Sequence, residues 1–183
     1  MKTKIAITGH SAGIGQALAS LYQQKNYEVV GLSRRNGFNI KYIPKILNEI
    51  ADCDIFINNA QSGFAQTELL FSVYEKWKGV SNKKIINIST MMTSLPVSPI
   101  PGYHLLQYHT QKIALEEAIR QLRNLSDWPK ICLVKPGAIG TQPGQTTPRP
   151  YADVNSWAKR LVDILDSGPD LEVEEIGLGV NYP

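Results

Sequence analysis

The sequence predicts an α/β fold in which a parallel β-sheet is covered by helices on both faces, and three observations predict it. Short apolar runs typical of buried strands recur along the 183 residues, helical stretches separate them, and the first strand leads into a glycine-rich turn. Strands buried on both faces form continuous apolar runs, because neither face meets water. The length and the 43% of hydrophobic residues suit one domain over residues 1–183.

Strands and helices alternate along the chain. Residues 4–8 predict a first strand, and apolar residues between positions 14 and 22 then recur at helical spacing. A second strand over residues 27–33 completes a βαβ unit. The remaining predicted strands are residues 54–58, 84–89, 131–135 and 171–178, and the remaining predicted helices are residues 42–51, 65–77, 103–125 and 154–166.

Two stretches, residues 93–102 and 137–150, are rich in proline or in glycine and proline. Neither can form a regular helix or a central strand. Both follow predicted strands, and loops that leave the carboxyl ends of strands line the ligand crevice of an open α/β sheet. We therefore expect these loops to contact substrate. The alternative is that they are connections without a function.

Composition excludes several classes of function. The net charge is only +3 and the basic residues are scattered, so no basic stripe predicts nucleic-acid binding. No apolar run approaches the ~18 residues that cross a bilayer, and no signal peptide precedes the first strand. We therefore expect a soluble, cytoplasmic protein that binds no membrane. Cys53 and Cys132 lie in apolar runs and are interpreted as reduced core residues. The three histidines, His10, His104 and His109, lack the spacing of metal ligands.

Glycines at positions 9, 13 and 15 form a turn between the first strand and the first helix. Because they lack side chains, backbone N–H groups and the helix N-terminus can approach a phosphate. The pattern is T-G-x-x-x-G-x-G, and no G-K-[ST] follows, which disfavours a nucleoside-triphosphate P-loop. The turn is interpreted either as the phosphate site of a dinucleotide or as a tight turn without a ligand.

Tyr108 and Lys112 form a Y-x-x-x-K pattern within a predicted helix. Residues four apart lie on the same helix face, so both side chains would point into one cleft. The pKa of a tyrosine is ordinarily about 10. An ammonium group held nearby stabilises the phenolate and makes the proton easier to release. The alternative is an amphipathic tyrosine at the edge of a helix beside a solvated lysine.

Five motifs follow one another along the chain: residues 8–15, Asn58-Asn59-Ala60, Asn87-Ile88-Ser89-Thr90, residues 108–112 and Pro136-Gly137-Ala138-Ile139-Gly140-Thr141. In this order, over residues 4 to 178, they resemble the short-chain dehydrogenase/reductase family, and the chain looks like a compact classical-type member. The resemblance implies a Rossmann-type doubly wound parallel sheet in a single three-layer domain. It also implies hydride transfer between a nicotinamide cofactor and a small carbonyl or alcohol substrate.

The resemblance assigns cofactor contacts to residues of each motif. Asn58 is an exception, since it would hold neighbouring strands together. The pyrophosphate and its ribose would meet Gly9, Ser11, Gly13, Ile14 and Gly15, the adenosine would meet Asn39, Ile40, Asn59 and Ala60, and the nicotinamide side would meet Pro136, Gly137, Ile139 and Thr141 together with Tyr108 and Lys112.

The end of the second strand predicts which dinucleotide binds. An acidic residue there would bind the ribose 2′-hydroxyl of NAD, whereas a basic residue accommodates the 2′-phosphate of NADP. The chain has Ser33-Arg34-Arg35 at this point, and the planar, permanently charged Arg34 suits a phosphate, with Ser33 as a further hydrogen-bonding group. We therefore predict NADP(H). NAD(H) is the alternative, because Ala12 stands where many NADP-preferring relatives have a second basic residue.

The resemblance also assigns the catalytic groups. Tyr108 would protonate the carbonyl oxygen in reduction and act as the base in oxidation, while Lys112 lowers the pKa of the tyrosine and holds the nicotinamide ribose. A hydroxyl group would hydrogen-bond the substrate oxygen. Thr90 stands at that position, where most relatives have serine, and Ser89 is the second candidate.

The chain departs from the family pattern in several places. Tyr103 is followed four residues later by Gln107 rather than lysine, which favours Tyr108. The asparagine that completes the family's tetrad has no clear counterpart, and Gln66 is the candidate for its place. The chain is also shorter than usual around the third strand, after Ala60 and after Thr141, so we expect incomplete enclosure of the substrate.

Two functions are compatible with this pattern. The first is an NADP(H)-dependent carbonyl reductase or alcohol dehydrogenase, and the second is a non-catalytic dinucleotide-binding regulator or scaffold of the same fold. Family members commonly associate through the helix that carries Tyr108, so a homodimer or homotetramer is expected, with Leu115, Ile119 and Leu122 as an apolar stripe. The alternative is that this stripe faces the sheet.

Overall fold

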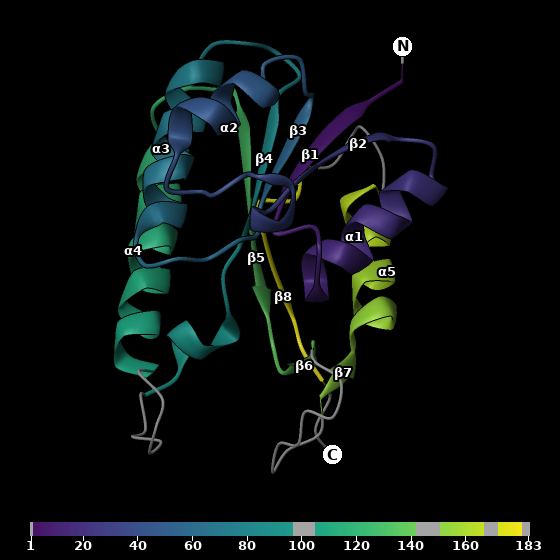
Figure 1. Cartoon of the computed structure of the whole chain (residues 1–183). Coiled ribbons are helices and arrows are strands. Elements are labelled where there is room, and N and C mark those ends of the chain that lie inside the picture. Colours follow the sequence, from purple (N-terminus) through teal and green to yellow (C-terminus); the bar gives the residue numbers. More distant parts are fainter. Residues whose placement is uncertain (1, 97–104, 142–150, 167–171, 181–183) are drawn as a thin grey trace.

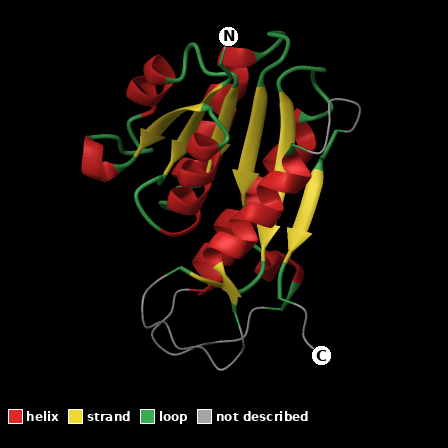
Figure 2. Ribbon diagram, turned by 90° about the vertical axis from the view of Figure 1, so that its right-hand side faces the viewer, coloured by secondary structure: helices red, strands yellow, loops and turns green. Residues whose placement is uncertain are grey.

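The structure, a computed structural model, describes residues 2–96, 105–141, 151–166 and 172–180. At its centre is a sheet of six parallel strands in the order β2-β1-β3-β4-β5-β8, which confirms the predicted doubly wound α/β fold (Figures 1 and 2). The strands are β1 (Lys4–Thr8), β2 (Glu28–Leu32), β3 (Ile55–Asn58), β4 (Lys84–Ile88), β5 (Lys130–Pro136) and β8 (Glu175–Leu178).

Helices cover both faces of this sheet. On one side lie α1 (Gly13–Gln24) and α5 (Val154–Leu165), and on the other lie α2 (Ile43–Glu49), α3 (Ala65–Trp77) and α4 (Leu105–Leu122) (Figure 1). Local signals start some of them. Pro44 stands in the first turn of α2, where its missing N–H costs no helical hydrogen bond. The side chain of Asp153 caps α5 by accepting a hydrogen bond from the Ser156 backbone N–H at 2.8 Å.

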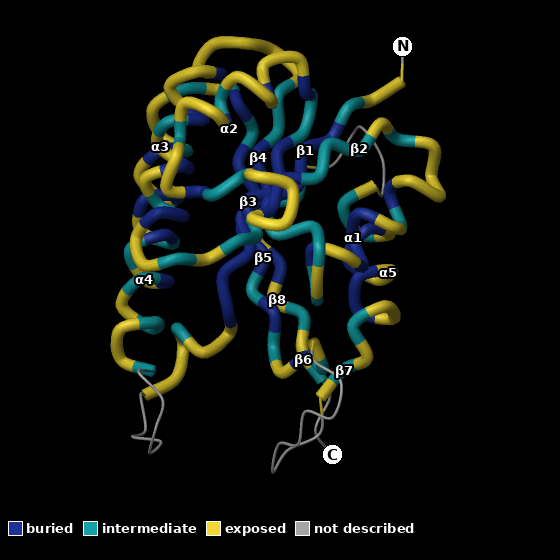
Figure 3. The backbone as a smooth tube through the Cα atoms, in the orientation of Figure 1, coloured by how far each residue is buried: buried dark blue, intermediate teal, exposed yellow. Residues whose placement is uncertain are grey.

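Two apolar clusters fill the spaces between the layers. Phe56, Leu69 and Tyr74 belong to the cluster under α2, α3 and α4, and Leu18 and Trp157 to the cluster under α1 and α5. The central strands that separate the two clusters are buried along most of their length (Figure 3). Both cysteines are buried and free, as the sequence predicts. No helix of the described ranges is long and apolar enough to cross a membrane.

The apolar stripe of α4 faces the sheet. Leu115, Ile119 and Leu122 are all buried in the cluster under this helix. Their interpretation as a subunit interface is therefore wrong, and the reason is that a helix packed on a sheet has the same 3.6-residue periodicity as one packed on a partner. Leu106 and Ile113 are the exposed large apolar residues of α4.

β2 lies at one edge of the sheet. In the usual dinucleotide-binding sheet, with strand order 3-2-1-4-5-6, a further strand lies outside the second one. Here residues 33–54, all of them described, contain a short helix η1 (Arg34–Asn36) and α2 but no strand. The chain is thus shortened where the usual sheet has its third strand, and β2 becomes the edge strand. The reversal of strand order between β1 and β3 is retained.

Every predicted helix and strand is present. The ends of β1 and α3 are as predicted, and the other elements have at least one shifted end. The largest shift within the described residues is in the last strand, which begins at Glu175 rather than near residue 171. A short helix η2 (Met91–Ser94) and a pair of two-residue strands, β6 (Ile139–Gly140) and β7 (Ala152–Asp153), were not predicted. Elements this short contain too few residues for a hydrophobic period.

Candidate functional site

The glycine turn is closed so tightly that side chains would not fit. Gly9 and Gly13 have φ angles of +72° and +54°, which favour glycine. A Cβ atom on Gly15 would lie 2.8 Å from Asn59 Nδ2 and nearer still to the Gly9 carbonyl oxygen. The turn therefore holds α1 with its N-terminus facing the carboxyl edge of the sheet, and no side chain caps that end. This arrangement suits a phosphate group.

The end of β3 is fastened to the glycine turn. Thr8 Oγ1 accepts hydrogen bonds from the backbone N–H groups of Asn59 and Ala60, at 2.9 and 3.0 Å. Asn59 Nδ2 donates in turn to the Thr8 carbonyl oxygen at 2.9 Å. Asn58 lies deeper and donates to Asn87 Oδ1 at 3.1 Å, so it joins β3 to β4 as expected. These bonds fix the two loops that would flank a dinucleotide.

Two arginines lie at the carboxyl end of β2. Asn36 Oδ1 accepts from both the backbone N–H and the hydroxyl of Ser33, which shapes η1 and engages the Ser33 side chain. Arg34 and Arg35 are exposed, and Arg35 Nη1 donates to the Ser11 carbonyl oxygen at 3.3 Å. Arg35 thus reaches the glycine turn. Only Arg34 of this pair was named from the sequence, as the residue that suits a 2′-phosphate.

The two residues predicted at the adenine differ in exposure. Ile40 is buried within the cluster under α2 and α3. Asn39 is half-buried, and its side chain accepts from the Lys41 backbone N–H at 3.1 Å. The structure therefore leaves Asn39 the more accessible of the pair.

Residues from most of the predicted motifs meet around one cavity of about 220 Å³. It opens where β3, β4 and β5 end, beside the start of α1 and the first part of α4. Gln61, which sequence reasoning missed, also lines the cavity and is hydrogen-bonded to Gln111. The lining residues are Ile14, Asn59, Gln61, Ile88, Ser89, Thr90, Tyr108, Lys112, Pro136, Gly137, Ile139 and Thr141.

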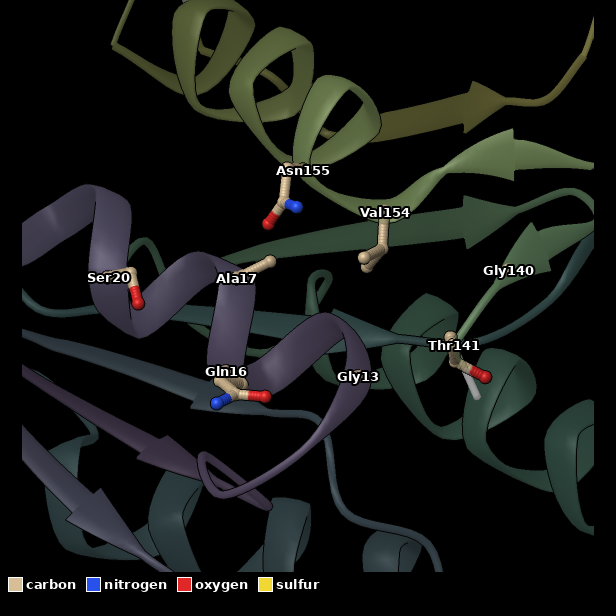
Figure 4. A pocket seen from close by; sticks show the side chains of 8 residues that line it. All are labelled: Gly13, Gln16, Ala17, Ser20, Gly140, Thr141, Val154 and Asn155. Carbon is tan, nitrogen blue, oxygen red and sulfur yellow. The ribbon is translucent and has the colours of Figure 1, made fainter. Parts of the chain in front are cut away.

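A second hollow, of about 520 Å³, lies between the start of α1 and the start of α5 (Figure 4). Its polar side chains include Gln16, Ser20 and Asn155, and it shares Gly13 and Thr141 with the predicted cofactor residues. None of its lining residues is charged. The smaller cavity, which contains the tyrosine and the lysine, is therefore the candidate active site.

Tyr108 and Lys112 lie together in the 220 Å³ cavity, one turn apart on α4. Lys112 Nζ is 5.7 Å from the centroid of the Tyr108 ring. Tyr108 is hydrogen-bonded to Thr90. Because Thr90 Oγ1 accepts from the Met92 backbone N–H at 3.3 Å, its own hydrogen can be donated to Tyr108. The tyrosine, the lysine and the threonine thus form one contiguous group.

Burial governs the protonation of both groups on α4. It raises the pKa of Tyr108 above its ordinary value, while the hydrogen bond with Thr90 opposes this shift. The pKa of Tyr108 is thus raised in the folded protein, because removing the phenolate from water has the larger effect. Burial lowers the pKa of Lys112 to about 8, and the nearby carboxylate of Glu116 opposes this shift.

The two candidate hydroxyl groups have different partners. Ser89 Oγ donates to Glu116 Oε1 at 2.5 Å. Thr93 Oγ1 and Lys135 Nζ bind the same carboxylate at 2.9 and 3.0 Å. Ser89 is thereby engaged by a partly buried ion pair, whereas Thr90 contacts Tyr108. This geometry favours Thr90. Sequence reasoning missed Glu116, although its position four residues after Lys112 places it on the same helix face.

Several predicted features fall outside the described residues. Tyr103 and His104 belong to them, as do most of the two loops expected to contact substrate. Only residues 93–96 and 137–141 of those loops are described. Within the described ranges, no group of histidine, cysteine, aspartate and glutamate side chains could hold a metal ion.

A glycine turn that opens a helix where the strand order of a parallel sheet reverses defines the class of dinucleotide-binding α/β proteins. The model of the NAD dependent epimerase/dehydratase family matches residues 5–75. The 3-ketodihydrosphingosine reductase of Bacteroides thetaiotaomicron is 27% identical, over 75% of this chain. The chain spans 64% of the length of that relative.

Solved structures share the fold. An alcohol dehydrogenase from Thermococcus sibiricus in complex with 5-hydroxy-NADP has a TM-score of 0.71 at 17% identity, over 98% of this chain and 97% of its own. The 3-alpha-hydroxysteroid dehydrogenase from Pseudomonas sp. B-0831 in complex with NADH has a TM-score of 0.71 at 20% identity, over 96% and 94%. The five motifs, in order on this sheet, resemble those of the short-chain dehydrogenase/reductase family, and the solved dehydrogenases share the fold of this chain.

Proposed function

We propose that this protein is an NADP(H)-dependent oxidoreductase that transfers a hydride between the nicotinamide and a small carbonyl or alcohol substrate. The observation that carries this proposal is the meeting of Tyr108, Lys112 and Thr90 in one cavity at the carboxyl edge of the sheet. The matches support it, since the curated relative is named a reductase and one structural neighbour an alcohol dehydrogenase.

The residues around the cavity fit a dinucleotide. The glycine turn leaves no room for a Cβ atom at Gly15 and exposes the uncapped N-terminus of α1, as a pyrophosphate requires. Arg34 and Arg35 stand where a ribose 2′-phosphate would lie, which favours NADP(H) over NAD(H). Pro136, Gly137, Ile139 and Thr141 would hold the nicotinamide side, next to Tyr108.

The chain's own residues would perform the proton transfer. When bound, the cofactor supplies or accepts the hydride. Thr90 and Tyr108 would both hydrogen-bond the substrate oxygen. In reduction, Tyr108 would give its proton to this oxygen as the hydride reaches the carbon, so the π bond of the C=O group breaks, the C–O single bond remains, and new C–H and O–H bonds form. The ammonium of Lys112 stabilises the phenolate that remains, and oxidation is the reverse of these steps.

Tyr108→Phe tests this assignment. The variant loses the proton donor but keeps the ring, so we expect NADPH-dependent turnover to fall at least about a thousandfold while NADPH affinity changes less than about threefold. A panel of aldehydes and ketones followed by NADPH absorbance measures the first quantity, and fluorescence titration measures the second.

Two results would contradict the proposal. Retained turnover in Tyr108→Phe would remove the tyrosine from the chemistry. A wild-type protein that binds NADPH but reduces nothing in the panel, and oxidises no alcohol with NADP, would favour a non-catalytic dinucleotide-binding protein. Tyr151→Phe is the matched control, because Tyr151 is exposed and lies outside the 220 Å³ cavity.

A further inference from the structure

Gln66 is a polar side chain buried in the first turn of α3, with 2% of its surface exposed. Its Nε2 donates to the carbonyl oxygens of Asn58 and Ile88, at 2.7 and 3.0 Å. Its own backbone oxygen accepts from Asn58 Nδ2 at 2.9 Å. These contacts attach Gln66 to the ends of β3 and β4, the strands that border the candidate active site.

The same contacts determine which way the Gln66 amide faces. The amide nitrogen must point toward the two carbonyl oxygens, because the reversed amide would place an oxygen against both of them. Gln66 Oε1 is therefore directed away from the strand ends. It accepts a hydrogen bond from Lys112 Nζ at 2.8 Å.

Lys112 Nζ has a second acceptor, the Ile88 carbonyl oxygen, also at 2.8 Å. An ammonium group carries three N–H donors. Two of them are held by Gln66 and Ile88, which leaves one for the cavity that contains Tyr108. Lys112 is 3% exposed, so these two bonds determine where its charge lies.

The charged and titratable groups around this ammonium are few among the described residues. Tyr108 and Glu116 are on its own helix, and Lys135 of β5 pairs with Glu116 at 3.0 Å. The partners from α3 and β4, Gln66 and Ile88, are neutral. Among the side chains that the structure describes, Gln66 is thus the one that is hydrogen-bonded to the ammonium.

We propose that Gln66 is a positioning residue that holds the Lys112 ammonium beside Tyr108 by accepting one of its hydrogen bonds. The effect of Gln66 on catalysis rests on the proposed function, but the hydrogen bond by which Gln66 positions Lys112 does not. A neutral acceptor stabilises the ammonium only moderately, whereas a carboxylate at the same place would stabilise it more. The identity of residue 66 therefore sets the pH range over which Lys112 is charged.

The test compares Gln66→Met and Gln66→Glu with the wild type. Proteins labelled with ¹³C at the lysine ε-carbons are titrated without cofactor, and Lys112→Arg identifies the Lys112 signal. We expect the pKa of Lys112 to fall by about one unit in Gln66→Met, which lacks the acceptor, and to rise by about one unit in Gln66→Glu. Gln121→Met, an exposed glutamine on α4, is expected to leave the titration unchanged.

If the pKa of Lys112 is displaced in opposite directions in the two variants, the positioning role is supported. Titration curves that coincide with that of the wild type overturn it. Circular dichroism tests whether each variant is folded. If Gln66→Met does not fold, the displacement of the Lys112 titration in Gln66→Glu decides alone. The second arm follows kcat/KM for NADPH against pH, whose alkaline limit is expected to move with the pKa of Lys112. Displaced titrations in a protein without turnover would contradict the proposed function while supporting the hold of Gln66 on Lys112.

Discussion

The surroundings of Tyr108 favour the protonated form of its side chain. Burial raises its pKa more than the hydrogen bond with Thr90 lowers it. At neutral pH the free protein therefore holds the phenol form, which is the form that protonates a carbonyl oxygen in reduction. Oxidation needs the phenolate, so the same environment opposes that direction until the cofactor and substrate contribute their own charges.

The pKa of Lys112 leads to a pH dependence for the reductase reaction. Because burial lowers this pKa to about 8, the ammonium is present below that pH and is lost as the pH rises through it. The proposed mechanism needs the ammonium beside Tyr108. We therefore expect kcat/KM for NADPH, which reports the free protein, to fall above pH about 8.

Lys112→Arg provides the control for this pH dependence. Arginine stays charged throughout the range, so whatever activity the variant retains should not decline near pH 8. A wild-type profile that is flat to pH 10 would contradict the role assigned to the lysine charge.

The arginines after β2 lead to a prediction about cofactor selectivity. Hydrogen bonds to charged groups contribute about 1.5–3 kcal/mol, and about 1.4 kcal/mol corresponds to a factor of ten in affinity. We expect the double variant Arg34→Ala/Arg35→Ala to bind NADPH about 10- to 100-fold more weakly, with NADH affinity changed less than about threefold. Fluorescence titration with both nucleotides measures this. Arg160→Ala, on the exposed side of α5, is the control, and equal losses for both nucleotides would refute the assignment.

At single residues, the sequence predicts a side chain's chemistry better than its partner. The pairing of Tyr108 with Lys112 follows from helical spacing, and Thr90 follows from its place at the end of a strand. The bond between Glu116 and Ser89 does not follow from either pattern, because it joins residues 27 positions apart whose contact depends on how α4 packs on β4. The upward shift of the Tyr108 pKa likewise depends on burial in the folded protein.

The glycine turn has a backbone that is sensitive to substitution. Gly15→Ala would place a Cβ atom 2.8 Å from Asn59 Nδ2 and against the Gly9 carbonyl, so the turn must open. We expect NADPH affinity to fall at least about tenfold and the free energy of unfolding to fall by about 1–3 kcal/mol. Nucleotide titration and urea denaturation measure the two effects. Gly177→Ala is the control, since a Cβ atom there meets nothing within 4 Å, and an equal effect of both variants would contradict this account.

Elements were predictable wherever hydrophobic periodicity extends over several residues. The strands β1, β3, β4 and β5 and the helices α3 and α4 correspond to clear apolar patterns. Short elements were not predictable in this way. η1 depends on Asn36, whose side chain accepts from Ser33 and donates to the Gly31 carbonyl oxygen at 2.7 Å, a local arrangement without an apolar period.

For the whole molecule, the expected self-association needs a surface other than the buried stripe of α4. Leu106 and Ile113 are 67% and 44% exposed and lie seven residues apart, on one face of α4. We predict a homodimer or homotetramer in analytical ultracentrifugation, and dissociation to monomers in Leu106→Lys/Ile113→Lys. Val80→Lys, an exposed apolar position outside the helices, should not change the mass. A monomeric wild-type protein would contradict the prediction.

The position of β2 at the edge of the sheet determines where insertions would leave the candidate active site undisturbed. The crevice for the dinucleotide depends on the strands that end at Thr8, Asn58 and Ile88, and β2 is the last strand on one side of them. The groups proposed as catalytic therefore keep their places although the sheet ends at β2. Insertions between η1 and α2 should for the same reason disturb the groups around Tyr108 less than equal insertions between β3 and α3, where Gln66 must reach Lys112.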